Sequence, residues 1–181
     1  MRLFIASDIH GDADCCQAML EAFAKENAEK ILILGDILYH GPRNDLPEGY
    51  APKKVIEILN NIADKLLCVR GNCDTEVDQM VLTFPILADY AYILTDGLRI
   101  FVTHGHKYNT QTPPPLAEGD ILLHGHTHIP AAESFGKNNL YINPGSVSIP
   151  KEGSEKGYIM YEDRRFEFCK LGGEVYKAVE V

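Results

Sequence analysis

The first third of the chain alternates short apolar runs with a stretch of helical periodicity. Residues 2–7 and 30–34 are mostly apolar, and each run leads into an aspartate. Continuous runs of this length predict strands buried on both faces of a sheet. Between them, apolar residues within 16–24 recur at the spacing of one helix face, and Asp12 or Asp14 would cap that helix. The pattern therefore predicts a strand, a helix and a second strand.

The next segment repeats this organisation. Pro52 lies near the first turn of a predicted helix whose apolar stripe runs to Leu66, and residues 66–69 then form a third predicted strand. A short helix is expected over residues 77–84, where Pro85 would end it.

From residue 91 onward the pattern changes to short β-rich segments with an Asp96-Gly97 turn. Residues 107–119 contain three consecutive prolines and are expected to form a surface loop. The order of elements predicts one domain, residues 1–181, in which two sheets lie between outer helices. The predicted strands are 92–95, 99–103, 121–124, 140–143, 158–161, 166–169 and 175–181.

Polar side chains follow several of these strands. In open α/β sheets the ligand crevice lies beyond the carboxyl ends of the strands, so these side chains are expected to converge. They comprise two carboxylates, one amide and four imidazoles, all of which bind divalent cations. Seven ligands exceed the needs of one catalytic zinc but suit two ions, about 3.5 to 4 Å apart, that share a bridging carboxylate. The candidates are Asp8, His10, Asp36, Asn72, His104, His126 and His128, with Gly11, Gly35, Gly71, Gly105 and Gly125 beside them to permit sharp turns.

Composition limits the functions open to the chain. Of 181 residues, 45% are hydrophobic and 24% are charged, which excludes wholesale disorder. The net charge of −9 disfavours a stable nucleic-acid partner. Two divalent ions would bring +4 against the −2 of Asp8 and Asp36, so an acidic chain can still attract an anionic substrate. The five cysteines include no C-x-x-C pair, so no disulfide framework or zinc ribbon is expected.

The beginning of the chain carries little hydrophobic sequence. Only four consecutive apolar or small residues precede the first strand-end charge, too few for a signal peptide or a membrane span. A cytoplasmic location without membrane association is therefore expected.

Five motifs stand at the strand ends in a fixed order: Asp8–Gly11, Gly35–Asp36, Gly71–Asp74, Thr103–His106 and Gly125–His128. They resemble those of the calcineurin-like metallophosphoesterases. More narrowly, residues 40–44, 47–52, 71–74 and 143–151 resemble the YfcE-type bacterial phosphodiesterases, and the likeness extends over nearly the whole chain. It implies a four-layer α/β/β/α sandwich of two mixed β-sheets flanked by helices.

The resemblance also implies a division of the ligands between two divalent metal ions, with Asp36 bridging. Manganese is the expected metal, with zinc, iron or nickel as alternatives. A water shared by both ions would have its pKa lowered toward about 7 and could attack phosphorus in line with the leaving oxygen. A small-molecule phosphodiester substrate and a homodimer or homotetramer are implied as well. One metal would be held by Asp8, His10, Asp36 and His128, and the other by Asp36, Asn72, His104 and His126.

One position departs from the wider superfamily. Many members have a histidine that serves the leaving group where this chain has Cys73, and a neutral thiol is a poor acid. We therefore expect a preference for diesters over monoesters and for good leaving groups. The catalytic candidates are Asp36, Asn72, Cys73, Asp74 and His104.

Other polar residues near these motifs are candidates for supporting roles. His40 and Arg43, together with Cys73, are candidates for substrate contacts, and Arg43 is the better phosphate clamp because of its planar, five-donor fork. His106 and His124 would orient the ligands. A structural turn is favoured for residues 143–146, with Ser146 capping backbone groups.

Two other functions remain open on the same fold. One is a phosphomonoesterase or nucleotidase, and the other is a non-catalytic interaction scaffold like the retromer subunit of this superfamily. Retention of all seven candidate ligands weighs against the scaffold. Neither a P-loop nor a G-x-G-x-x-G turn occurs in the chain, so no nucleotide cradle is predicted.

Overall fold

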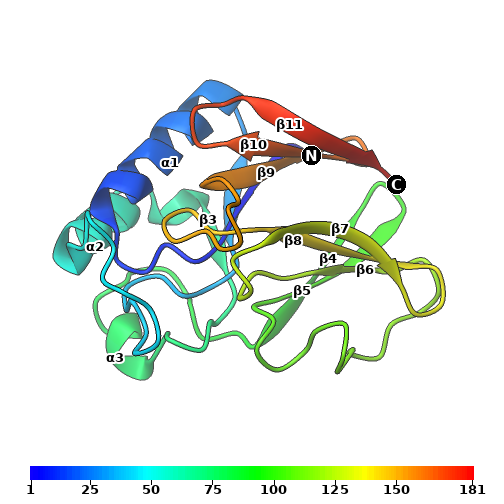
Figure 1. Ribbon diagram of the computed structural model, residues 1–181, viewed down its shortest axis with the longest axis horizontal. Helices are drawn as coiled ribbons and strands as arrows, with labels where there is room; N and C mark the ends of the chain where they lie inside the picture. The colour runs from blue at the N-terminus through cyan, green and yellow to red at the C-terminus, as the bar shows by residue number, and fades with distance from the viewer.

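Strands from both ends of the chain form the first β-sheet. The computed structural model describes residues 1–181, and in it the three strands of the early segment, β1, β2 and β3, are parallel to one another. The late strand β9 pairs antiparallel with β1 and brings the C-terminal strands into the same sheet (Figure 1). In sheet order the strands are β11 (Val175–Glu180), β10 (Arg165–Lys170), β9 (Gly157–Glu162), β1 (Leu3–Ala6), β2 (Lys30–Ile33) and β3 (Leu66–Cys68).

The second sheet is formed by the middle of the chain. Its three inner strands, β5, β6 and β8, are parallel, and the antiparallel strands β4 and β7 close its two edges. Like the first sheet it is mixed, as predicted. The order is β4 (Tyr90–Thr95), β5 (Leu98–Thr103), β6 (Ile121–Leu123), β8 (Asn139–Pro144) and β7 (Pro130–Phe135).

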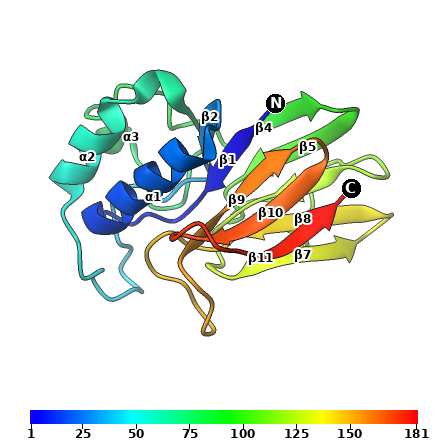
Figure 2. The same ribbon diagram turned by 90° about the horizontal axis from the view of Figure 1, so that it is seen from above.

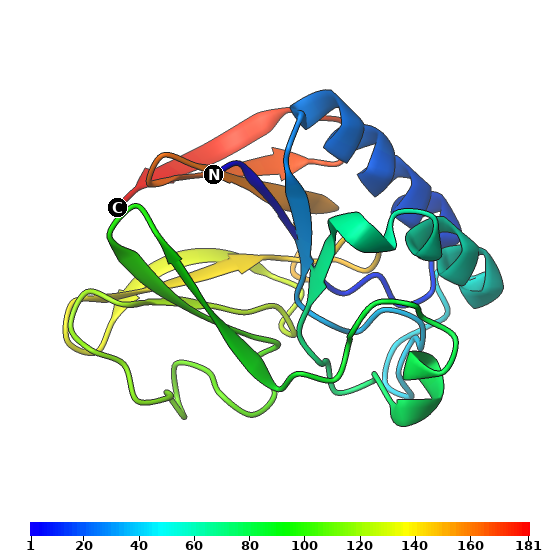
Figure 3. The same ribbon diagram turned by 180° about the vertical axis from the view of Figure 1, so that it is seen from behind.

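Alternating residues of the first sheet face two different cores. On one face, Phe4 and Ile31 pack against the helices, whereas on the other face Ile5, Leu32 and Ile159 pack against the second sheet. Because every one of these side chains is buried, the strands carry the continuous apolar runs that a sheet covered on both sides requires. Figure 3 shows the two sheets lying against each other, with the helices outside the first.

The helices α1 (Ala13–Glu26) and α2 (Pro52–Asn60) both lie on the outer face of the first sheet (Figure 2). Asp12 caps α1, because its carboxylate accepts a hydrogen bond from the Cys15 amide at 2.9 Å. No helix is both long and apolar enough to cross a lipid bilayer.

Two predicted helices are shorter than the periodicity indicated. The second ends at Asn60 and is followed by a 3₁₀ turn at Ala63–Lys65, and the third, α3, covers only Glu76–Gln79. The Gln79 side chain bonds the backbone of Leu82, Phe84 and Ile86, so it satisfies polar groups that a longer helix would have paired.

The structure differs from the sequence-based expectation at the second sheet in two ways: it has one more strand, and no helix covers it. Strand β7 was not predicted because its residues Glu133-Ser134 break the apolar alternation. No helix follows α3, so the helical layer lies over the first sheet only. Residues 107–119 form the predicted loop without helix or strand, since the three prolines and polar residues there lack a helical stripe.

Candidate metal centre

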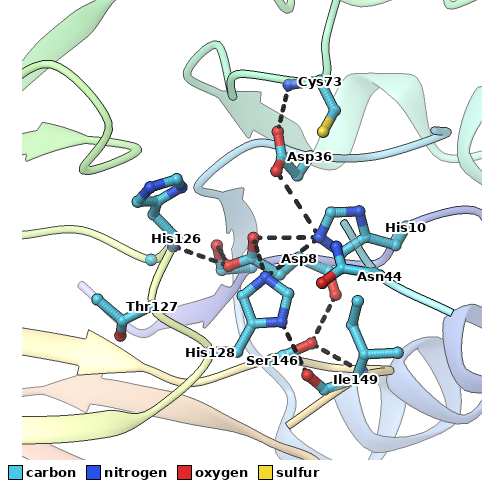
Figure 4. A network of polar contacts seen from close by, with 12 residues as sticks. Asp8, His10, Asp36, Asn44, Cys73, His126, Thr127, His128, Ser146 and Ile149 are labelled. Carbon is cyan, nitrogen blue, oxygen red and sulfur yellow. Dashed lines mark hydrogen bonds and ion pairs between the residues drawn. The ribbon is translucent and has the colours of Figure 1, made fainter. Parts of the chain in front are cut away.

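The segments that follow five strands meet at one end of the two sheets. Asp8 and His10 come after β1, Asp36 after β2 and Asn72 after β3, while His104 follows β5. The remaining two candidates, His126 and His128, follow β6. The convergence predicted from the strand ends is therefore observed for all seven residues, and Figure 4 shows most of them facing a common centre.

Three of these residues form what we call the inner set: Asp8, His10 and His128. Their ligand atoms lie within 4.8 Å of one another. The Asp8 Oδ1 atom is 3.5 Å from His10 Nε2 and 3.2 Å from His128 Nε2, and the two Nε2 atoms are 3.2 Å apart. All three side chains are buried. One carboxylate oxygen and two imidazole nitrogens thus lie close enough together to hold one ion.

Three others form the outer set: Asn72, His104 and His126. The His104 Nε2 atom lies 3.0 Å from Asn72 Oδ1 and 3.1 Å from His126 Nδ1. Asp36 faces both sets, because its Oδ2 atom is 3.4 Å from His104 Nε2 and 3.7 Å from His10 Nε2. A single carboxylate oxygen therefore stands between the two sets.

Backbone carbonyls fix the orientation of three of the imidazole rings. The Nδ1 atoms of His10, His104 and His128 lie 2.8, 2.7 and 2.8 Å from carbonyl oxygens. A carbonyl can only accept, so Nδ1 carries a proton and Nε2 points into the centre, where it offers a lone pair whenever the ring is neutral. The acceptors are the carbonyls of Tyr39, Leu34 and Ile149, respectively.

The donor atoms of the centre fit cations. Two neutral Nε2 lone pairs at 3.2 Å, as in His10 and His128, have no hydrogen to share. The Asp8 Oδ1 atom is buried and has no hydrogen-bond donor. Such an orphaned carboxylate oxygen among imidazole lone pairs costs free energy unless positive charge compensates it. Oxygen and imidazole nitrogen suit manganese, iron, zinc or nickel equally well.

The pKa values of His104 and Asp8 also indicate a site for positive charge. Burial alone would lower the pKa of His104, but its hydrogen bond to Asp36 and the charge of Asp8 raise that pKa to about 9. Burial would raise the pKa of Asp8, yet its contacts with His10 and His128 hold that pKa well below its usual range. The centre therefore keeps its carboxylates ionised and attracts positive charge, which a proton or a metal ion can supply.

The backbone of the centre is strained. Asp8, His10, Asp36, His126 and His128 have φ angles of 58°, 49°, 57°, 67° and 62°, in the left-handed region that non-glycine residues seldom adopt. Each such residue costs of order 1–3 kcal/mol, and strain of this kind clusters at functional sites. The rest of the fold must offset this cost, since five of the seven candidate ligands share it.

Two of the predicted glycines allow segments to approach closely. A Cβ atom at Gly125 would collide with the Ser7 hydroxyl and lie 2.7 Å from the Asp8 carboxylate. A Cβ atom at Gly71 would collide with the Asp36 carboxylate. Any larger residue at either position would displace a candidate ligand.

Asp74 was predicted to be catalytic, but its position indicates a different role. It is buried, does not line the central cavity, and accepts backbone hydrogen bonds from Asp36, Ile37 and Gly71 at 2.8, 2.9 and 2.7 Å. Burial raises the pKa of this carboxyl to about 6. Asp74 therefore positions the segment that carries Asp36.

Three serines that the sequence did not single out as parts of the centre support Asp8. The Ser7 hydroxyl donates to Asp8 Oδ2 at 2.6 Å, and the hydroxyls of Ser146 and Ser148 donate to the Asp8 carbonyl at 2.8 and 3.1 Å. The Ser146 contact matches the predicted capping role. Serine is so common in turns that no sequence signal distinguished Ser7 or Ser148.

The cavity at the centre is small, about 60 Å³. Arg43 and Cys73 line it as predicted, and Lys151 adds a cation that sequence inspection missed. His40 does not line it, because its ring packs between Tyr39 and Tyr50, at centroid distances of 4.7 and 5.4 Å.

The two histidines expected to orient ligands make no hydrogen bond to any of them. His124 stacks on Tyr141, with ring centroids 4.4 Å apart, and its Nδ1 atom contacts the Gly125 carbonyl, so it bonds no candidate ligand. Burial lowers the pKa of His124 to about 4. His106 lies beside the rings of His104 and His126, at centroid distances of 5.4 and 6.3 Å, without a hydrogen bond to either.

Comparisons with known proteins agree with this geometry. Residues 1–164 match the calcineurin-like phosphoesterase superfamily domain. The chain is 52% identical to phosphodiesterase YfcE of Escherichia coli K12 over 163 residues, which is 90% of this chain and 88% of that protein. A solved structure of YfcE, described as a phosphoesterase from E. coli, superposes with a TM-score of 0.94 at 48% identity, covering 99% of this chain and 98% of the other.

More distant structures share the fold alone. Vps29 from Entamoeba histolytica, solved in complex with Zn²⁺, superposes with a TM-score of 0.63 at 20% identity, covering 99% of this chain and 98% of that one.

Proposed function

The chain belongs to the calcineurin-like phosphoesterase superfamily, and from that premise we propose that it is a metal-dependent phosphodiesterase with a dinuclear centre. The observation that carries the proposal is the position of Asp36 Oδ2, which lies 3.4 Å from His104 Nε2 and 3.7 Å from His10 Nε2. A carboxylate placed between two sets of imidazole lone pairs is suited to bridge two ions.

The two sets would each hold one divalent ion. The inner set and Asp36 supply the ligands of one, and the outer set and Asp36 supply those of the other. Two such ions, when bound, supply positive charge for phosphate oxygens and lower the pKa of water toward neutrality. We propose manganese as the native metal, as the likeness to the YfcE-type phosphodiesterases implies, and the oxygen and nitrogen donors of the centre would accept it as they would iron, zinc or nickel.

Arg43 and Lys151, the two cationic side chains at the cavity, would recognise the substrate. Both line the cavity, and the guanidinium fork of Arg43 suits two phosphate oxygens at once. Together with bound metal ions, they give a positive pocket in a protein whose net charge is −9. A small anionic ester is therefore the substrate class that the pocket would attract.

Cys73 limits the leaving groups that the site can handle. Burial, followed by the charge of Asp36, raises the pKa of the Cys73 thiol, so the thiol stays protonated and is a weak acid toward a departing alkoxide. We propose that diesters with good leaving groups are preferred over monoesters, because a monoester's further negative charge also lies against Asp8 and Asp36.

The test is hydrolysis by the purified protein with measured metal content. Bis(4-nitrophenyl) phosphate and 4-nitrophenyl phosphate would be compared with and without added Mn²⁺, Zn²⁺ or Ni²⁺. We expect two metal equivalents per chain and a kcat/KM for the diester at least about tenfold above that for the monoester. A preference for the monoester would instead support a phosphomonoesterase. A protein that binds no metal and hydrolyses neither compound would support the scaffold.

Two expectations from the sequence remain predictions. A cytoplasmic location would be checked by cell fractionation. A homodimer or homotetramer would be checked by sedimentation equilibrium of the full chain. Edge strand β4 offers exposed apolar side chains for such an assembly, among them Tyr92 and Leu94.

A further inference from the structure

The cavity between the two sets cannot hold a whole phosphodiester. At about 60 Å³ it has room for roughly four to six water-sized groups, at about 10–15 Å³ each. Two ions and the oxygens of one phosphoryl group would fill it. The two organic groups of a diester must therefore lie outside it, against whatever surfaces adjoin its walls.

One adjoining surface is an apolar groove of about 380 Å³. Of its 11 lining residues, 7 are hydrophobic. The lining comes from the segment between β2 and α2, from α2, from the segment between β3 and α3, and from α3 with Val81 beyond it. Figures 1 and 3 show α3 beside the segment that follows β2. The groove includes Leu38, Tyr39, Tyr50, Ile56, Val77 and Val81.

Two residues connect the groove to the metal centre. Cys73 lines both the groove and the central cavity, so its side chain belongs to the walls of both spaces. Tyr39 lines the groove with its side chain, while its carbonyl accepts the Nδ1 proton of His10 at 2.8 Å. The groove is therefore the apolar surface that begins at the cavity wall, on the other side of the thiol.

A second pocket that adjoins the cavity is polar rather than apolar. Arg43, Asn44 and Lys151 line the central cavity and also this pocket of about 420 Å³, in which only 2 of 12 lining residues are hydrophobic. Three cations there face three carboxylates, so the pocket has no net formal charge but many hydrogen-bonding groups. An apolar group placed there would leave those polar groups without water.

We propose that the substrate is an unsymmetrical phosphodiester, in which one ester group is apolar and the other is polar. The apolar ester group lies in the groove against Tyr39, Val77 and Val81, past Cys73, and the polar one lies beside Arg43 and Lys151. The exposure of Val77, at 69%, and of Val81, at 44%, fits a surface that an apolar ligand covers. This inference rests on the proposed phosphodiesterase function and names its substrate class.

Binding of phosphonates tests the groove without a chemical step. Inhibition constants of phenylphosphonate and methylphosphonate would be measured on the metal-loaded protein, together with the NMR shifts of the Val77 and Val81 methyl groups. We expect phenylphosphonate to bind about tenfold more tightly than methylphosphonate, and its addition to shift those methyl signals. Equal inhibition constants and unshifted signals would overturn the proposal.

A double variant and a matched control test whether the preference for phenylphosphonate arises in the groove. Val77→Asn with Val81→Asn is expected to reduce the tenfold ratio to about threefold or less, because the groove loses apolar surface. Met80→Asn changes a residue that is 83% exposed, adjacent in sequence and outside the groove, so the ratio should stay at its original value. An unchanged ratio in the double variant would contradict the assignment. Circular dichroism would establish that both proteins are folded.

A pair of 4-nitrophenyl diesters tests the polar side. With the nitrophenyl group in the groove, a 2-methoxyethyl second ester group, which has no hydroxyl that could attack phosphorus, should give a kcat/KM at least about threefold above that of a hexyl group. A hexyl ester that is equal or better would overturn the proposed asymmetry. The proposed function fails separately, if the metal-loaded protein hydrolyses no diester at all.

Discussion

The inner and outer sets differ in how firmly the protein holds them. Asp8, His10 and His128 are 0%, 1% and 3% exposed, whereas Asn72 is exposed and His126 is half-buried. Both inner imidazoles donate Nδ1–H to a backbone carbonyl. The inner position is therefore arranged before any ion arrives.

The outer position is only partly arranged in this way. His104 has its carbonyl partner, but His126 has none, and the Asn72 amide donates only to the Cys73 sulfur, at 3.2 Å. The hydrogen-bond partners of metal ligands commonly change metal affinity by about 10- to 100-fold. The inner position, where both imidazoles have such partners, is therefore expected to bind its ion more tightly. Asp36 alone faces both positions, so its substitution is expected to reduce metal binding and kcat/KM more than the substitution of any other ligand.

The largest effect is expected from Asp36→Asn. The substitution removes one of two negative charges and replaces one carboxylate oxygen by an amide nitrogen that cannot bridge, so both ions should bind poorly and kcat/KM should fall by about 1,000-fold, or about 4 kcal/mol. Metal analysis and diester kinetics would measure this. The control is Asp64→Asn, whose side chain is 77% exposed on a 3₁₀ turn. Two bound metals and a kcat/KM within tenfold of wild type would refute a bridging role.

One variant in each set would compare the metal affinities of the inner and outer positions. We expect His10→Ala to weaken metal binding at the inner position by about 100-fold, and His126→Ala to weaken the outer position by about 10-fold, because His126 has no backbone partner to lose. Competitive titration with a coloured chelator would report both dissociation constants. Millimolar Mn²⁺ should then restore activity to His126→Ala but not to His10→Ala. The reverse order of affinities would show that the inner set is not the firmer one.

Much of this site could be predicted from the sequence, because the residue that follows a strand lies at a known edge of the sheet. A buried parallel strand delivers the residue after it to the same edge as its neighbours, so Asp8, Asp36 and Asn72 had to lie close together. The two mixed sheets could be predicted for a similar reason, since apolar runs mark the strands of both. The pattern did not reveal β7, whose polar residues Glu133 and Ser134 hide its alternation.

Roles that depend on backbone contacts could not be predicted in this way. The carbonyls of Tyr39, Leu34 and Ile149 orient imidazoles, yet every residue has a carbonyl, so no side-chain pattern marks them. Asp74 appeared catalytic because it follows Asn72 and Cys73 in a motif, whereas its carboxylate points back to three amides. The groove likewise depends on α3 lying beside the segment after β2, which no periodicity specifies.

Removal of metal should have a smaller but measurable effect on stability. At a metal concentration 100 times the dissociation constant, binding adds about 2.7 kcal/mol, which corresponds to about 5–10 °C in Tm for a chain of this size. Differential scanning calorimetry before and after chelation would measure the loss. Because the inner position is firmer, the first metal equivalent returned should restore most of it. Equal steps for the two equivalents would contradict the difference between the sets.

The smallest effect is expected from Cys73→His, beside the outer set. An imidazole that can hold a proton near neutral pH should assist an alkoxide leaving group, so kcat/KM toward unactivated alkyl diesters should rise by about tenfold. The gain stays below the usual 10²- to 10⁴-fold because the surrounding groove, with Leu38 and Tyr39, is shaped around a thiol. Cys73→Ser, which is similar in size but no better as an acid, is the control. Unchanged or lower activity of Cys73→His on alkyl esters, with its metal content intact, would show that leaving-group protonation does not limit this enzyme. In that case the ions of the two sets would account for the reaction without an acid at this position.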